Sequence, residues 1–198
     1  MSKAVVQNLR ILWERLVEQG GRVTVLWAVD HVVRIVTGAP VRNVSEITPQ
    51  LHVGGQHRQR GWERLKARGI TAVVNLRIEF DDEGAGMAPR RYLYLPTVDD
   101  TPPSLEHLRE GVAFITEEIE DGGGVYVHCG SGVGRAPTMA AAYLVSTGLR
   151  PEEAWAKIRE KRPFIRPKPE QVAQVDRFAE VLRHDRATAR GENPDGMA

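Results

Sequence analysis

The sequence predicts an α/β fold with a mainly parallel central sheet of about four to five strands flanked by helices. Three observations lead to this prediction. Short apolar runs typical of buried strands alternate with helical segments of roughly 10–15 residues. The 198 residues suit a single domain with a short appendage. Hydrophobic residues make up 41% of the chain, which is enough to build a sizeable core at this length.

Residues 1–43 are expected to form an amphipathic helical extension ahead of the domain. Apolar side chains recur at helical spacing over residues 5–19, and Gly20-Gly21 ends this pattern. A second apolar stretch, from Val23 to Val36, is too short and too often interrupted by charge to cross a membrane. We expect the two helices to pack on the domain. Attachment to a membrane surface or to a partner is the alternative.

Residues 44–184 are expected to form the domain, and the polar residues 185–198 a flexible tail. Ser104 and Pro151 are suited to the starts of the helices that they open. Strands are predicted at 51–53, 70–76, 91–96 and 125–127, and helices at 58–68, 104–120, 136–148, 152–162 and 170–184. This alternation is the pattern that predicts the parallel sheet.

Charge and composition exclude several classes of protein. The 27 basic and 26 acidic residues leave a net charge of +1, so the chain lacks the electrostatic signature of a nucleic-acid-binding protein. The single cysteine can form neither an internal disulfide nor a thiolate zinc site by itself. The first 20 residues do not resemble a signal peptide. We therefore expect a cytoplasmic protein that uses no cofactor and no metal.

The strongest functional signal is the run that contains this cysteine, HCGSGVGRAP from His128 to Pro137. A strand ends here, glycines permit a tight loop, and a helix begins, so the loop amides can form an anion site at the helix N-terminus. The helix dipole favours the thiolate form of Cys129, and the planar fork of Arg135 matches two oxygens of a tetrahedral oxyanion. The predicted phosphate-binding residues are Gly130, Ser131, Gly132, Val133, Gly134 and Arg135.

This run resembles the signature of the cysteine-dependent phosphatases, the protein tyrosine and dual-specificity phosphatase superfamily, in which His-Cys is followed by five residues and Arg. The resemblance covers roughly residues 44–182. Val74-Asn75-Leu76-Arg77 is similar to the central strand of the family, and the run from Arg162 to Val175 to its dual-specificity pattern, with Gln174 as a matching glutamine. The resemblance implies the compact dual-specificity fold and metal-free hydrolysis through a phosphocysteine on Cys129, with Arg135 holding the phosphate.

The resemblance also implies a general acid on a mobile loop, which here runs from Leu95 to Leu108. Asp99 and Asp100 are both candidates, and the Thr-Val-Asp context favours Asp99. His128 is expected to orient Cys129 rather than to transfer protons. Arg77 ends a buried strand, so it either touches substrate or forms a structural ion pair.

Several polar segments near these motifs have less specific interpretations. The other five histidines, His57 among them, are expected to have no catalytic role. The acidic stretch from Glu79 to Glu83 is expected to be a solvated loop, although a similar loop in the mitochondrial lipid phosphatase branch of the family leaves a lid role open. The basic side chains of residues 159–168 are expected to be solvated helix ends, or alternatively to attract anionic substrates.

One position departs from the family pattern, because Ala136 stands where a Ser or Thr usually follows the Arg. A hydroxyl there would stabilise the departing thiolate in the second half-reaction. The loop carries no added charge of the kind often found in polyphosphoinositide phosphatases, so we expect phosphotyrosine, phosphoserine or phosphothreonine proteins as substrates. A phosphatidylglycerophosphate-like or phosphoinositide-like lipid is one alternative, and a pseudophosphatase that only binds phosphate is another.

Overall fold

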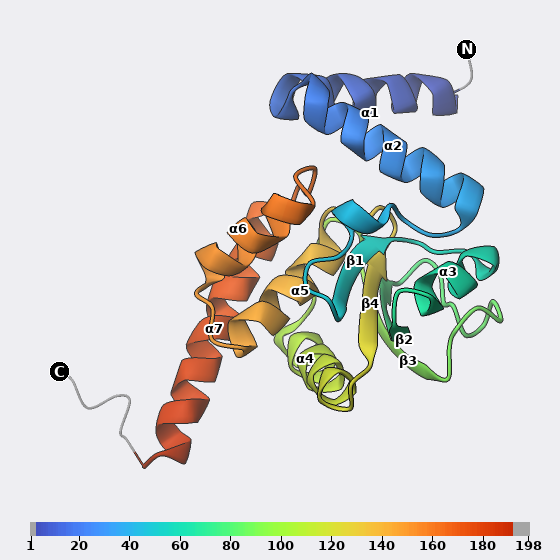
Figure 1. Ribbon diagram of the computed structural model, residues 1–198. Coiled ribbons are helices and arrows are strands. Elements are labelled where there is room, and N and C mark those ends of the chain that lie inside the picture. Colours follow the sequence, from blue (N-terminus) through green and yellow to red (C-terminus); the bar gives the residue numbers. More distant parts are fainter. Residues whose placement is uncertain (1–2, 192–198) are drawn as a thin grey trace.

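The computed structural model describes the backbone of residues 3–191 and the side chains of residues 10–191. Its centre is a four-stranded sheet in the order β1-β4-β2-β3, and every pair of neighbouring strands is parallel (Figure 1). The strands are β1 (Leu51–Gly55), β2 (Ile70–Arg77), β3 (Arg91–Thr97) and β4 (Gly124–Cys129). The predicted α/β class and the mainly parallel sheet are therefore confirmed.

The helices cover both faces of this sheet. They are α1 (Lys3–Gln19), α2 (Gly21–Thr37), α3 (Trp62–Lys66), α4 (Leu105–Glu120), α5 (Arg135–Ser146), α6 (Pro151–Lys161) and α7 (Pro169–Ala189). Short 3₁₀ turns lie at Arg42–Val44 and Gln59–Gly61. Most of the main apolar core lies between the sheet and α4–α7, and a smaller cluster that contains Val73 and Tyr126 lies on the α3 side.

Two helical predictions need correction. The helix predicted at 58–68 is a 3₁₀ turn followed by the five-residue α3. The last helix does not end at 184, because α7 continues to Ala189 and takes in the first five residues of the predicted 185–198 tail. Contacts hold this extra turn: Asp185 pairs with Arg109, and Arg186 donates to the carbonyl of Ser146. Residues 192–198 lie outside the described residues.

The parallel sheet brings the predicted site residues to one edge. Because all four strands run the same way, their carboxyl ends lie together, and these ends include Arg77, Thr97 and Cys129. The turn from β4 into α5 passes close to β1. A Cβ on Gly132, whose φ is 69°, would lie 2.2 Å from the carbonyl carbon of Gly54. Only glycine permits this left-handed conformation and this close approach.

The N-terminal helices α1 and α2 form an antiparallel hairpin at one end of the molecule, with α2 lying between α1 and the sheet (Figure 1). The buried residues of α2 are Thr24, Asp30 and Arg34, all of them polar. The hairpin therefore packs on the domain, and the buried side chains of α2 that face the domain are polar. Within residues 3–191 no helix is both long and apolar enough to cross a bilayer.

Candidate active site

The loop from Cys129 to Gly134 forms the floor of the site. The Cys129 thiol is 3% exposed and accepts a hydrogen bond from the Gly132 amide over 3.3 Å. The carbonyls of the loop are held from outside: Arg162 donates to Gly132 O over 2.7 Å and to Ser131 O over 3.1 Å, and the Arg166 amide donates to Val133 O. Because these carbonyls face outward, the loop amides are available to an anion beside the thiol.

Arg162 corrects the expectation that the basic residues near the end of α6 are solvated. Its side chain is completely buried. Besides the two loop carbonyls, its guanidinium donates to Val44 O and pairs with Asp30 Oδ2 at 3.2 Å. One side chain thus connects the phosphate-binding loop to the start of the domain and to α2, so we assign it a structural role in holding the loop.

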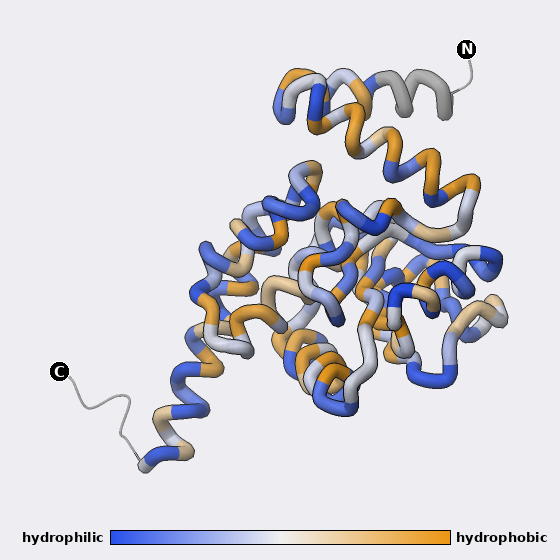
Figure 2. Tube along the Cα trace, in the orientation of Figure 1, coloured by the Kyte–Doolittle hydropathy of each residue, from blue (hydrophilic) through white to orange (hydrophobic). Residues whose placement is uncertain are grey.

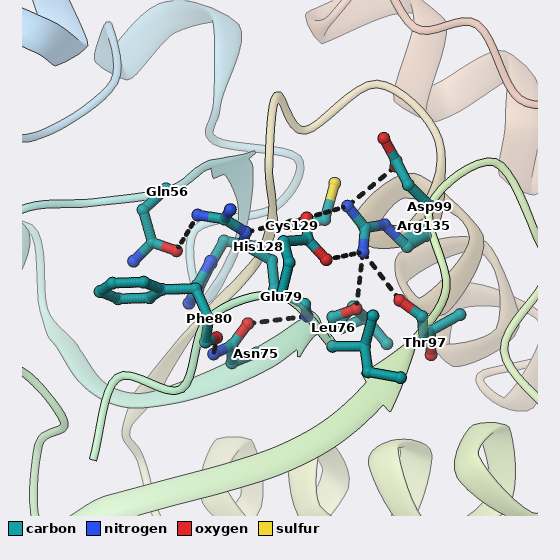
Figure 3. A network of polar contacts seen from close by, with 12 residues as sticks. Gln56, Asn75, Leu76, Glu79, Phe80, Thr97, Asp99, His128, Cys129 and Arg135 are labelled. Atoms are coloured by element: carbon teal, nitrogen blue, oxygen red, sulfur yellow. Dashed lines mark hydrogen bonds and ion pairs between the residues drawn. The ribbon is translucent and has the colours of Figure 1, made fainter. Parts of the chain in front are cut away.

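Arg135 lies at the first position of α5 and is 1% exposed. Its Nη1 donates to Leu76 O over 3.3 Å and to Thr97 O over 2.8 Å. Glu79 accepts from Nη1 at 2.9 Å and from Nη2 at 2.8 Å, and Asp99 Oδ1 lies 2.8 Å from Nη2 beside the Cys129 thiol (Figure 3). The Arg135 Nε is buried and has no hydrogen-bond partner among the described residues. The Nε–Nη2 edge is therefore the side of the fork that can receive an oxyanion.

Arg135 and Glu79 each stabilise the charged form of the other. The hydrogen bond from Arg135 outweighs partial burial and lowers the pKa of Glu79 to about 2, so its carboxylate is ionised at neutral pH. Burial disfavours the charged form of Arg135, but the hydrogen bond to Glu79 and the neighbouring negative charges raise its pKa above the usual value. The guanidinium is consequently held both in place and in its charged form.

The two acid candidates differ in position. Asp99 follows β3, is 77% exposed and directs its carboxylate to the Arg135 fork. Asp100 has a φ of 61° and pairs with Lys168 Nζ at 3.3 Å. The geometry thus brings Asp99 to the site and leaves Asp100 on the flank. The loop that carries both residues is attached to α7, since Gln171 donates to Thr101 O and Gln174 donates to Pro103 O.

A buried polar cluster lies behind Cys129. His128 and His57 each place Nε2 on the same oxygen of Asp82, at 2.7 Å and 3.0 Å, and all three side chains are fully buried. Burial lowers the pKa of His128 more than the Asp82 carboxylate raises it. Burial also opposes ionisation of Asp82, but the hydrogen bonds from His128 and His57 outweigh it and hold the pKa of Asp82 well below its usual range. The cluster is thus a carboxylate with two imidazole donors.

The structure corrects one expectation. Asp82 belongs to the stretch expected to be solvated, yet it is buried, and Glu79 at the start of that stretch contacts Arg135. His57 is also buried and orients Asp82. Two imidazoles and a carboxylate within 4.8 Å of one another have the ligand types of a metal site. Their hydrogen bonds to one another, however, already account for the same ligand atoms.

Arg77 forms a structural contact, which is one of its two predicted roles. Its Nη1 donates to Gln56 Oε1 over 3.0 Å, and its Nε donates to Glu79 Oε1 over 3.1 Å. Gln56 in turn donates to Asp82 Oδ1 over 2.6 Å. Arg77 and Gln56 thereby connect the Glu79–Arg135 pair to the buried cluster. Sequence patterns do not identify Gln56, because its partners come from two other segments.

Ala136 leaves the thiol without a hydroxyl donor. Its side chain is buried at the start of α5. The nearby Thr138 directs its hydroxyl to Gly134 O over 2.9 Å, and Ser131 is exposed. Among the described residues, the Gly132 amide is the one hydrogen-bond donor to Cys129 Sγ. The departure from the family pattern is therefore not compensated by a neighbouring hydroxyl in this conformation.

Comparison with known proteins agrees with this geometry. The family model described as "Dual specificity phosphatase, catalytic domain" matches residues 51–180, which include the whole sheet and the loop. The chain belongs to the dual specificity phosphatase family. The proposed catalytic loop from Cys129 to Arg135 lies inside the matched region, as do Asp82 and Asp99. The extension formed by α1 and α2 precedes it.

Similar relatives and structures support the assignment. The chain is 34% identical to dual specificity protein phosphatase 5 of Rattus norvegicus over 132 residues, which is 66% of this chain and 33% of that protein. It is 32% identical to human dual specificity protein phosphatase 2 over 150 residues, 74% of this chain and 46% of that protein. The crystal structure of PTPMT1 is 27% identical with a TM-score of 0.65, and the match covers 73% of this chain and 98% of that chain. The chain thus spans less than half the length of these curated relatives.

Proposed function

We propose that this protein hydrolyses phosphomonoesters through a phosphocysteine intermediate. In the first step Cys129 Sγ forms a bond to phosphorus while the bond from phosphorus to the leaving oxygen breaks, and Asp99 gives that oxygen a proton. In the second step water attacks phosphorus, Asp99 takes a proton from the water, and the S–P bond breaks to release phosphate and the thiolate. Protons and electron pairs balance without a metal.

The observation that carries this proposal is the Nε–Nη2 edge of Arg135, which lies beside the thiol. Its buried Nε lacks a partner among the described residues, whereas Nη1 is held by Leu76 O, Thr97 O and Glu79. A phosphate on the loop amides would satisfy Nε and share Nη2, which Asp99 now contacts. Asp99 would move from Arg135 to the leaving oxygen as substrate binds.

The residues behind the loop have positioning roles in this proposal. Glu79 holds the guanidinium plane, and Arg77 holds Glu79. The Asp82 carboxylate fixes the ring of His128, and therefore the backbone on which Cys129 lies. None of these contacts reaches the position proposed for the reacting phosphorus, so each residue is expected to act through Cys129 or Arg135.

We propose phosphorylated proteins as the substrate class. The phosphate-binding loop carries no charged side chain between Cys129 and Arg135, so one phosphoryl group satisfies the site. The relatives that match the catalytic domain are named protein phosphatases. A cytoplasmic location fits the same chemistry, because Cys129 is free and must remain reduced to act as a nucleophile.

A lipid phosphate is the second candidate, and a groove next to the loop favours it. The groove lies between α2 and the segment after β2 and extends to Gly130. It combines the apolar side chains Phe80 and Met87 with the cations Arg34 and Arg77. The comparable crystal structure of PTPMT1 in complex with PI(5)P, 28% identical with a TM-score of 0.64, shows that a similar fold binds a phosphoinositide.

Hydrolysis of a small aryl phosphate, with and without vanadate, tests the proposal. Vanadate-sensitive turnover that needs no added metal is expected. Phosphopeptides and dispersed phospholipids, compared at equal phosphate concentration, then distinguish the two substrate classes by kcat/KM. Phosphate binding without turnover on any substrate would contradict the proposal and support the pseudophosphatase alternative.

A further inference from the structure

The N-terminal hairpin has its polarity reversed relative to the domain. In α2, the polar residues Thr24, Asp30 and Arg34 are buried. Figure 2 shows that hydrophobic residues recur along the whole of this helix. The exposed apolar residues of α2 are Val25, Val29, Val32, Ile35 and Val36. Four of these are separated by steps of four, three and four residues, which places them on one side of the helix.

The first helix repeats this arrangement. Arg15 is 4% exposed and donates to Phe164 O over 3.3 Å, and Gln19 donates to Ile165 O over 3.2 Å. In the part of α1 whose side chains are described, residues 10–19, the large exposed apolar residues are Leu12, Trp13, Leu16 and Val17, and Trp13 is 67% exposed. We call these four residues and the five from α2 the hairpin surface. Among the described residues, only Ile78 and Val98 are also large, hydrophobic and exposed.

The hairpin surface is continuous with the groove beside the proposed active site. Ile35 belongs to the hairpin surface and also lines the groove that reaches Gly130. Ile78 and Val98 are next to Glu79 and Asp99 in sequence, and Ile78 N donates to Thr97 O. The large exposed hydrophobic side chains of the described residues therefore lie on the hairpin and next to the site.

The side chains around the hairpin surface leave an excess of positive charge. Each acidic side chain of the hairpin has an arginine partner: Arg10 for Glu14, Arg166 for Glu18 and Arg162 for Asp30. Arg22 in α2 and Arg58 in the groove are exposed and form no ion pair with any residue from 10 to 191. An excess of positive charge therefore accompanies the apolar surface.

We propose that the hairpin surface attaches this protein to an anionic lipid bilayer. A bilayer matches both features, since it takes up exposed apolar side chains and its acidic head groups attract unpaired arginines. Tryptophan is also favoured at the level of the head groups, where Trp13 would lie. A second copy of the chain matches less well, because a two-fold interface on this surface would bring Arg22 and its equivalent towards each other.

Attachment of this kind would hold the catalytic loop at a set position relative to the bilayer. Asp30 of α2 pairs with Arg162, whose guanidinium also holds Ser131 O and Gly132 O of the loop. Arg34, one turn further along α2, donates to Gln56 O over 2.9 Å. These buried contacts join the hairpin to the site, so the two are expected to move as one unit. The proposal concerns attachment and does not depend on catalysis.

Vesicle cosedimentation tests the proposal on the full chain. The wild type is expected to bind phosphatidylcholine vesicles that contain phosphatidylserine, and to bind pure phosphatidylcholine vesicles at least about tenfold more weakly. The combined variant Trp13→Gln, Val17→Gln, Val29→Gln and Val36→Gln should lose at least about tenfold in affinity, because these residues would leave the hydrocarbon boundary. Its aryl-phosphate turnover and thermal unfolding should match those of the wild type.

A matched pair of arginine variants tests the electrostatic part. Arg22→Gln should weaken binding to the anionic vesicles by roughly fivefold, as expected for one cation near the surface. Arg150→Gln changes an exposed arginine at the start of α6 and should have no effect on binding. Equal losses in the two variants would show that net charge rather than the hairpin surface determines binding.

Two further measurements complete the test. Cys129→Ser should bind vesicles as the wild type does, so that failure of the proposed chemistry and failure of attachment are separate results. Wild type that does not cosediment with anionic vesicles would overturn the proposal. So would sedimentation velocity that shows a dimer which the four-residue variant converts to monomer, because the hairpin surface would then be an interface between copies.

Discussion

The sheet and the hairpin bury opposite kinds of residue. In β4, the apolar side chains Val125 and Val127 are completely buried against the helices that cover the sheet. In α2, which is also rich in valine, the side chains directed to the domain are Asp30 and Arg34, and Val29 faces solvent. The sheet is therefore stabilised mainly by removal of apolar surface from water, whereas the hairpin is attached by hydrogen bonds and a buried ion pair.

This difference shows what an amphipathic pattern specifies. The spacing of apolar residues in 5–19 and 23–36 correctly predicts two helices, each with an apolar and a polar side. It does not determine which side meets the domain. That choice depends on partners distant in sequence, such as Arg162 for Asp30, and on what else the apolar side contacts.

The largest effect is expected for Arg135→Lys, which should lower kcat/KM for aryl phosphate by roughly 10³-fold. A lysine cannot supply the Nε–Nη2 edge or the contacts of Nη1 to the β2 and β3 carbonyls. Arg22→Lys in the hairpin is the control and should leave this rate unchanged. Comparable losses in both variants would mean that the hairpin takes part in catalysis and would remove the contrast between the two regions.

Asp99→Asn should lower kcat by about 10²-fold for an alkyl phosphate, whose leaving oxygen needs a proton, and by less for an aryl phosphate. Asp100→Asn should change both rates little, since Asp100 pairs with Lys168 on the flank. A larger loss of kcat in Asp100→Asn than in Asp99→Asn would identify Asp100 as the general acid. Asp99 would then only neutralise the charge of Arg135.

Asp82→Asn should lower the free energy of unfolding at pH 7 by about 2–3 kcal/mol, because two hydrogen bonds to a buried carboxylate lose their charge. The folded-state pKa of Asp82 is depressed, so its contribution is present above its unfolded pKa of about 4 and is lost as pH falls. The part of the stability difference between wild type and Asp82→Asn that comes from ionisation of Asp82 itself should therefore be constant above about pH 4 and become smaller below it.

The lowered pKa of His128 gives a second pH dependence. This histidine is held neutral in the folded state, so protonation of the unfolded chain favours unfolding below about pH 6.5. Both wild type and Asp82→Asn should thus lose stability as pH falls below about 6.5. Urea unfolding from pH 7.5 down to 3.5 measures both effects. A stability difference that fails to narrow below about pH 4 would contradict the ionised form assigned to Asp82.

Matched valine substitutions compare the two regions directly. Val127→Ala should lower the free energy of unfolding by about 2 kcal/mol, because Val127 is completely buried in β4. Val29→Ala should change it by no more than about 0.5 kcal/mol, since Val29 is 49% exposed and alanine favours helix. Chemical denaturation measures both values. Equal losses of unfolding free energy in the two variants would show that the hairpin surface is buried in solution.

Ala136→Ser has the smallest expected effect and the opposite sign. A hydroxyl at this position could hydrogen-bond to the departing thiolate, and such a bond would raise kcat roughly tenfold where breakdown of phosphocysteine limits turnover. The wild type should then release a burst of leaving group, and the serine variant a smaller one relative to its steady rate. No burst and an unchanged kcat would mean that thiolate departure is not limiting despite Ala136.

The sequence predicts the fold, and the strand–loop–helix arrangement around Cys129, well because the information is local. Strand periodicity and the run from His128 to Pro137 specify the sheet and the loop without knowledge of distant contacts. The helix at 58–68 was predicted too long, since the chain turns at Gly61, where a Cβ would meet the backbone of Gly38. That close approach is a tertiary contact.

The residues that support the loop could not be found from local sequence patterns. Asp82, His57 and His128 come from three segments, and only the folded sheet brings them together. Arg162 is one of several cations near the end of α6, and nothing in its own segment distinguishes it from its exposed neighbour Lys161. Burial of a charged side chain depends on distant acceptors, here the carbonyls of residues 44, 131 and 132.

The most direct test of the central claim is to trap the covalent intermediate. Wild-type protein is mixed with aryl phosphate, quenched with acid during turnover and digested, and the peptide that contains Cys129 is analysed by mass spectrometry. The account predicts one phosphoryl group on Cys129, and neither phosphopeptide nor turnover in the Cys129→Ser variant. Turnover that persists in Cys129→Ser, or a phosphoryl group trapped on any other residue, would contradict it.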